Sequence, residues 1–313
     1  MDGPDQIPLI LLISECFKMK PSLMIDGVPN PIVTVCVATF QSEPYIERTL
    51  KAICEQSYPH LRCIISDDGS TDRTLEICTR IAENDSRVSV QANQDRLGWI
   101  GNMNRILAQD LGNYFVNISH DDEIKPQFLE SLLRHLSKYP EASVAFSDAE
   151  EFLGKNRERN RLFYDESIGN IPVSKRARPI AISRPLSHWF LAYHGLVRNS
   201  TLCVQRRLRR NLAGEFTADK LWVLGLALSG PFVRVPEVLW RKESTEDSVS
   251  AKWTYSLASL AAVQLSATKL VLGSGVNVLD RAKVCCFLFW GWARVAKWKI
   301  QSLFQVNEVD QAC

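Results

Sequence analysis

Short strand-forming runs alternate with amphipathic helical segments through the first half of the chain. Four runs are apolar and rich in β-branched residues, which is typical of buried strands: Ile32 to Ala38, Leu61 to Ser66, Val88 to Gln91 and Tyr114 to Ser119. Helical patterns with one apolar face lie between or after them, at Glu43 to Glu55, Thr74 to Glu83 and Pro126 to Lys138. This order predicts an α/β fold with a mostly parallel sheet flanked by helices.

Two acidic turns directly follow strand-forming runs. The first is Asp67-Asp68-Gly69-Ser70-Thr71-Asp72, and the second is His120-Asp121-Asp122-Glu123. Ligands of open α/β sheets bind beyond the carboxyl ends of the strands, where both turns are expected. Three consecutive carboxylates repel one another unless water or a cation neutralises them. Mg²⁺ and Mn²⁺ bind through one or two carboxylates together with substrate phosphates. The pattern indicates a site for a cation and a phosphorylated ligand, and the alternatives are a helix-capping turn and a solvated acidic loop.

The motifs around these turns resemble those of the family 2 glycosyltransferases, which have the GT-A fold. The similarity runs from about Pro31 to Asp148, with further signals to about Lys242. The motifs that carry it are Thr39-Phe40-Gln41, Gln56-Ser57-Tyr58-Pro59, Ser66 to Asp72, Gly98 with Asn102 and Asn104, and Ser119-His120-Asp121-Asp122. Five motifs in the family's order are more specific than any one of them.

The resemblance implies roles for individual residues. A nucleotide would lie along Thr39 and Phe40, and Asp68 would bind its base with Asp67 beside it. The remaining residues implied for the nucleotide are Asn102, Asp121 and Arg241. Asp121 and Asp122 would hold Mn²⁺ or Mg²⁺ at the diphosphate. Family members often carry another acid two residues before this pair, where this chain has Ser119, so either Glu123 compensates or the metal site uses fewer direct ligands.

The candidate general base is Asp219, at the start of an apolar helical segment that runs to about Leu228. Partial burial would raise its pKa, whereas the helix dipole would oppose that shift. The resemblance places a catalytic carboxylate in this segment, ahead of the turn at Gly230-Pro231-Phe232. Many family members have Glu-Asp where this chain has Ala218-Asp219. The alternative is that Asp219 only caps the helix.

The resemblance predicts a metal-dependent, inverting transfer of a sugar from a nucleoside-diphosphate sugar, with a UDP-sugar favoured, to a hydroxyl of a glycan or lipid-linked acceptor. Polysaccharide or glycolipid assembly is the expected setting. One alternative is a non-catalytic glycan- or lipid-binding subunit that keeps the fold. The other is a nucleotidyltransferase, which is disfavoured because no glycine-rich phosphate loop with a downstream lysine follows the first strand.

Composition limits the partners. The net charge of +2 gives no overall attraction to nucleic acid. The basic run Gln205 to Arg210 lacks interleaved aromatic residues, and we interpret it as a solvated face. Nine cysteines are present, and those in the predicted sheet and helices form no Cys-x-x-Cys pair, which favours core thiols in a reducing cytosol.

The carboxyl-terminal part differs from the rest in charge. The segment 281–307 holds five basic residues and no acidic one between Arg281 and Asn307, together with several aromatic residues. Such a helix suits a membrane interface, and the alternative is packing on the domain or on a dimer partner.

We expect an N-terminal extension (1–29), a catalytic domain (30–250, with halves 30–148 and 149–250) and a helical appendage (251–313), located at the cytoplasmic face of a membrane. Ile7 to Ile13 lacks a preceding basic region and does not predict a signal peptide.

Overall fold

A computed structural model describes residues 24–153 except 26, and residues 158–164, 188–202, 206–244 and 256–309 except 276. Residues 1–23 of the expected N-terminal extension lie outside this range. The described part of that extension forms a small hairpin of β1 (Met24–Ile25) and β2 (Val28–Pro29).

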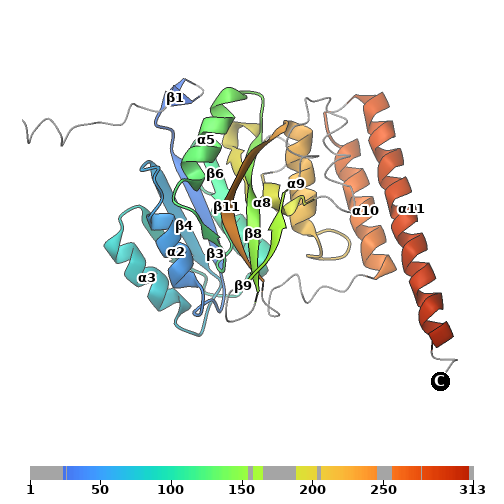
Figure 1. Ribbon diagram of the computed structural model, residues 1–313, viewed down its shortest axis with the longest axis horizontal. Coiled ribbons are helices and arrows are strands. Elements are labelled where there is room, and N and C mark those ends of the chain that lie inside the picture. Colours follow the sequence, from blue (N-terminus) through green and yellow to red (C-terminus); the bar gives the residue numbers. More distant parts are fainter. Residues whose placement is uncertain are drawn as a thin grey trace, which may run out of the picture.

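A nine-stranded sheet forms the centre of the molecule (Figure 1). Its strand order is β5-β4-β3-β6-β10-β8-β11-β7, and β9 pairs with β8. The first half is parallel, as predicted, and consists of β3 (Val33–Thr39), β4 (Leu61–Asp67), β5 (Val88–Ala92) and β6 (Tyr114–Asn117). The four predicted strands are therefore confirmed, with ends shifted by up to two residues.

The second half of the sheet is mixed. Its strands are β7 (Glu123–Ile124), β8 (Val144–Leu153), β9 (Glu158–Phe163), β10 (Leu196–Arg198) and β11 (Phe232–Ser244). Strand β10 runs antiparallel to both β6 and β8, whereas β11 is parallel to β8. The predicted α/β fold with a largely parallel sheet is therefore confirmed, and the antiparallel pairs lie in the second half, which is assembled by long-range pairing that local composition does not specify.

Helices cover the sheet. Those of the first half are α2 (Ile46–Cys54), α3 (Thr74–Asn84), α4 (Gly98–Leu107) and α5 (Phe128–Lys138). Those of the second half are the short α8 (Phe190–Tyr193), η1 (Asn199–Thr201) and α9 (Ala218–Ser229). Helix α9 buries nearly all its side chains, as its apolar sequence predicts, and Trp222 is fully buried.

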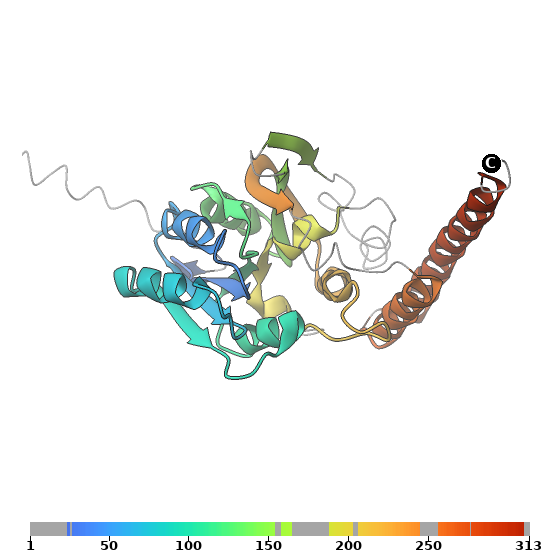
Figure 2. The same ribbon diagram turned by 90° about the horizontal axis from the view of Figure 1, so that it is seen from below.

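Two further helices lie beyond α9. Helix α10 (Leu257–Leu272) packs on α9, and α11 (Val278–Val309) packs on α10 (Figure 1). Figure 2 shows this pair projecting from the body that contains the sheet. None of the helices in the described residues is long and apolar enough to cross a bilayer.

Candidate active site

The first acidic turn is held by its own carboxylates and by α4. Strand β4 ends at Asp67, whose buried carboxylate accepts hydrogen bonds from the backbone N–H (2.9 Å) and the hydroxyl of Ser70. Gly69 has a φ of +75°, which a glycine adopts without strain. Asp67 therefore shapes the turn, and its expected role beside the base stays a prediction.

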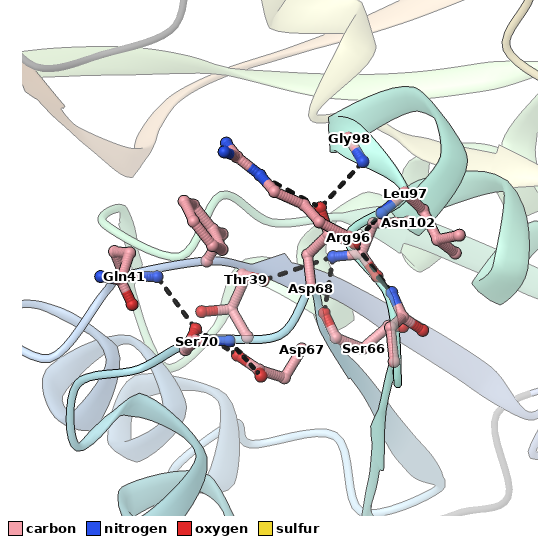
Figure 3. A network of polar contacts seen from close by, with 12 residues as sticks. Thr39, Gln41, Ser66, Asp67, Asp68, Ser70, Arg96, Leu97, Gly98 and Asn102 are labelled. Carbon is pink, nitrogen blue, oxygen red and sulfur yellow. Dashed lines mark hydrogen bonds and ion pairs between the residues drawn. The ribbon is translucent and has the colours of Figure 1, made fainter.

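Asp68 points from the turn toward the start of α4 (Figure 3). Its Oδ1 accepts hydrogen bonds from the Asn93 amide (2.9 Å) and from the Leu97 N–H (2.7 Å), and its Oδ2 accepts one from the Gly98 N–H (2.9 Å). Arg96 Nε lies 4.0 Å from the same Oδ2. The side chain is only 3% exposed, so this carboxylate is fixed in position before any ligand arrives.

Asn102 ties the ends of two strands together. Its Nδ2 donates to the carbonyl oxygens of Ser66 (2.8 Å) and Thr39 (3.3 Å), and its Oδ1 accepts from Asn93 (3.0 Å). Asn102 is buried, and so is Thr39, whose hydroxyl donates to Ser42 (2.8 Å). The structure thus brings Thr39, Asp68 and Asn102 together as predicted, and Asn102 acts here through the backbone of β3 and β4.

The second acidic turn follows β6 and is held by side chains of α2 and β11. Asp122 accepts hydrogen bonds from the indole N–H of Trp240 (3.0 Å) and from the backbone N–H of Glu243 (2.9 Å). The Thr49 hydroxyl lies within hydrogen-bond distance of the carbonyl oxygens of His120 (3.0 Å) and Asp122 (2.8 Å). Asp122 is 3% exposed, whereas its neighbour Asp121 is half-buried.

The carboxylate oxygens of Asp121 and Asp122 are of the ligand type that divalent cations such as Mg²⁺ and Mn²⁺ prefer. Burial raises the pKa of Asp122 well above its ordinary range, and the charge of Asp121 raises it further, whereas Lys242 opposes the shift. Neighbouring carboxylates that repel each other in a buried place are stabilised by a nearby cation. The described residues contain no group of three His, Cys, Asp or Glu side chains that could hold one. Mg²⁺ and Mn²⁺ take few protein ligands and complete their shells with phosphate oxygens and water, so they are the ions that these two carboxylates would suit.

The basic pair after Trp240 is divided between two faces of β11. Arg241 Nε lies 3.1 Å from Glu150, so the guanidinium is paired with β8. Side chains alternate along a strand, which puts Lys242 on the face of Trp240, where its charge acts on Asp122. The contact of Arg241 with a diphosphate stays a prediction, and Lys242 is the member of this basic pair whose charge acts on the acidic turn.

A row of rings links the acidic turn to α9. The indole of Trp240 lies 4.3 Å from the His194 ring, measured between centroids, and His194 lies 5.0 Å from Tyr193. Tyr193 in turn packs edge-on against Trp222 at 5.8 Å. Burial lowers the pKa of His194 to about 4, so the ring is neutral at pH 7 with Nδ1 2.9 Å from the Asn117 carbonyl oxygen.

Asp219 lies at the end of this row, in the first turn of α9. Burial raises its pKa to about 6, and the hydrogen bond from the Lys220 N–H (2.8 Å) opposes the shift. After burial, the charge of Asp219 contributes to raising the pKa of Tyr193. A carboxylate with a pKa near 6 is ionised and basic at neutral pH, which is the state that a general base requires.

A family model for glycosyl transferase family 2 matches residues 34–194, half of the 313-residue chain. This chain belongs to that family. The family 2 chain is 35% identical over 108 residues to an uncharacterized glycosyltransferase of Haemophilus influenzae (34% of this chain, 33% of the relative). Over 105 residues it is 31% identical to the GalNAc(5)-diNAcBac-PP-undecaprenol beta-1,3-glucosyltransferase of Campylobacter jejuni (33% and 34%). The match thus spans about a third of each relative.

Solved structures agree on the fold. TarS of Staphylococcus aureus (residues 1–349, in complex with UDP-GlcNAc) superposes with a TM-score of 0.65 at 17% sequence identity, covering 82% of this chain and 71% of that one. The GT-A fold predicted from the motifs is therefore confirmed for this member of family 2.

Several residues of this site were missed by sequence reasoning. Trp240 and Thr49 hold the acidic turn from segments remote in sequence, and Arg96 lies in a loop without a motif. Asn117 is buried in β6, and in the part of the chain described neither polar atom of its side chain has a hydrogen-bond partner. A polar residue at the end of an apolar strand was the one signal that could have indicated Asn117.

Proposed function

We propose that this protein transfers a sugar from a nucleoside-diphosphate sugar, preferably a UDP-sugar, to a hydroxyl group of a glycan or lipid-linked acceptor. Cell-surface polysaccharide or glycolipid assembly is the setting we infer. Family membership supports the reaction class. The name of the Campylobacter jejuni relative supports a lipid-linked acceptor, and the UDP-GlcNAc bound by TarS supports a uridine nucleotide.

One observation carries the proposal. Three carboxylates from separate segments lie along the carboxyl ends of the strands: Asp68 after β4, Asp121 after β6, and Asp219 at the start of α9. The ring contacts run from Trp240, which binds Asp122 next to Asp121, through His194 to Tyr193, on which the charge of Asp219 acts. A nucleoside-diphosphate sugar extending along this edge would present its base to Asp68 and its diphosphate to Asp121.

The residues then support an inverting displacement. Asp219 removes the proton of the acceptor hydroxyl as its oxygen attacks the anomeric carbon. The bond from that carbon to the diphosphate oxygen breaks on the opposite face, and the nucleoside diphosphate leaves with the electron pair. The neighbouring Lys242 adds positive charge near Asp122.

A divalent cation, Mn²⁺ or Mg²⁺, would be held by Asp121, with Asp122 beside it as the carboxylate fixed by Trp240 and Glu243. When bound, it would offset the negative charge that develops on the leaving diphosphate.

We further propose the division into a catalytic domain (30–250) and a helical appendage (251–313), and contact of the appendage with the cytoplasmic face of a membrane.

The test is a thermal-shift panel of UDP, GDP, dTDP and CDP, each with and without Mn²⁺. We expect one nucleotide to stabilise the native protein when Mn²⁺ is present, by about 2.7 kcal/mol at a hundred times its Kd. Asp121→Asn should lose the Mn²⁺-dependent part and keep the melting temperature of the free protein.

Asp122→Asn is the matched comparison. Its amide nitrogen would face one of the two N–H donors, that of Trp240 or that of Glu243, so the free variant should unfold at a lower temperature. Absence of stabilisation by every nucleotide would overturn the proposed function and favour a glycan-binding subunit.

A further inference from the structure

Asp68 has one acceptor position left. A carboxylate offers about four hydrogen-bond acceptor positions. Asn93, Leu97 and Gly98 fill three of them, two at Oδ1 and one at Oδ2. Among the described residues no N–H donates to the fourth, which is at Oδ2, the oxygen that faces Arg96.

Arg96 covers this open position. Its Nε lies 4.0 Å from Oδ2 of Asp68, too far for a hydrogen bond, and its guanidinium carbon lies 3.9 Å from the centre of the Phe40 ring. The two contacts place a flat group with N–H donors on an aromatic ring beside a buried carboxylate. Figure 3 shows Arg96 next to Asp68. Arg96 itself is 65% exposed and comes from the loop before α4, so it is free to move to solvent.

A nucleobase would use the same two contacts. Its face would stack on Phe40, and a ring N–H would donate to the open position of Asp68. Stacked groups are separated by about 3.5–4 Å, so a base between Phe40 and a guanidinium needs about 7 Å from ring to guanidinium. The observed 3.9 Å leaves no such room.

The geometry points to Arg96 as a gate of the nucleobase site: its guanidinium occupies the place of the base in the free protein, and the base of the donor must displace it. This inference rests on the proposed function and adds a specificity element to it. Uracil and guanine carry a ring N–H that can replace the guanidinium at Asp68, whereas cytosine carries none.

Nucleosides test the gate, because they carry no phosphates. Their binding therefore contains no attraction between Arg96 and a diphosphate. Binding of uridine, guanosine and cytidine is measured by ligand-observed NMR, and binding of UDP and GDP by calorimetry. In Arg96→Ala we expect the nucleoside of the preferred nucleotide to bind about two- to fivefold more tightly, the equivalent of one exposed cation–π contact.

Two further variants make the result specific. Phe40→Leu removes the platform that Arg96 and the base share, so adding Arg96→Ala to it should give no further gain. Arg134→Ala is the charge control, since Arg134 is an exposed arginine paired with Glu130 on α5. It should leave nucleoside binding unchanged.

The outcomes separate the two proposals. If the native protein binds UDP or GDP but Arg96→Ala binds the nucleoside equally or more weakly, the gate is overturned and the donor site stands. A gain that persists in the Phe40→Leu background would also overturn the gate. If neither nucleotide binds to the native protein or to Arg96→Ala, the proposed function fails, and the gate fails with it.

Discussion

Asp219 shows how one residue acquires a chemical role from its position. The start of α9 lowers the pKa of a carboxylate, and burial raises it. Burial is the larger effect here, and the pKa of Asp219 rises to about 6. Because of this raised pKa, the ionised carboxylate of Asp219 is a stronger base at neutral pH than an exposed aspartate.

This pKa predicts the pH dependence of catalysis. Below pH 6 Asp219 is protonated and cannot accept the acceptor proton, so the rate should fall as pH decreases through about 6. Asp219→Asn should reduce turnover by about a hundredfold or more and remove this acidic limb. Release of UDP or GDP from a panel of nucleotide sugars measures both effects.

Nucleotide affinity is the control for this variant. Asp219→Asn should bind UDP as the native protein does, because the hydrogen bonds that fix Asp68 come from Asn93, Leu97 and Gly98 and none comes from Asp219. A native rate for the Asn variant would show that another group removes the proton.

At the scale of elements, α2 positions the second acidic turn. Thr49 contacts two carbonyl oxygens of the turn, and Arg48 donates to a third, that of Asp121 (2.8 Å). Arg48 also pairs with Glu243 of β11 (2.8 Å), whose N–H binds Asp122. A turn rich in repelling carboxylates is thus fixed from outside by a helix and a strand.

Thr49→Val tests this support, because valine has nearly the same shape and no hydroxyl. The buried carbonyl oxygen of Asp122 and the partly buried one of His120 would lose a donor, so the free energy of unfolding in urea should fall by about 1–2 kcal/mol. The Mn²⁺-dependent stabilisation by nucleotide should weaken as well. Thr79→Val on α3, where the hydroxyl contacts only its own helix, should change neither quantity. Unchanged metal dependence in Thr49→Val would mean that the turn holds its shape without α2.

At the scale of the whole molecule, α11 presents opposite faces to α10 and to solvent. Val284 and Leu288 are buried, whereas Lys283, Phe289 and Trp290 are exposed, the last two by 66% and 55%. Of the predicted cationic side chains beyond residue 291, only Lys297 is described, and it is exposed. Aromatic and basic residues on one face are typical of helices that lie in a membrane interface.

Trp290→Glu therefore should weaken binding to vesicles of anionic lipid by about tenfold, because it removes an aromatic anchor and adds a repelling charge. Co-sedimentation measures this binding. Thr79→Glu adds the same charge on the catalytic body and should bind as the native protein does. Equal binding by both variants would indicate that α11 contacts a protein surface instead.

Local sequence patterns were enough to predict the parallel half of the sheet, the helices α2, α3, α5 and α9, and the two acidic turns. These features depend on local periodicity and turn chemistry within short segments. The shared motifs with family 2 added the fold and the identity of Asp68, Asp121 and Asp219 as candidate residues. The expected roles of these three residues, like those of Asp67, Asn102 and Arg241, remain predictions.

The tertiary structure alone decided the rest, because long-range pairing sets which side chains meet. It gave Asp121 and Asp122 different environments, because the indole N–H of Trp240, 118 residues away in sequence, binds Asp122. It turned Arg241 toward Glu150 and Lys242 toward the acidic turn, since the register of β11 on β8 fixes the faces of the strand. It also laid Arg96 on Phe40, a contact between two loops that no motif in either loop encodes.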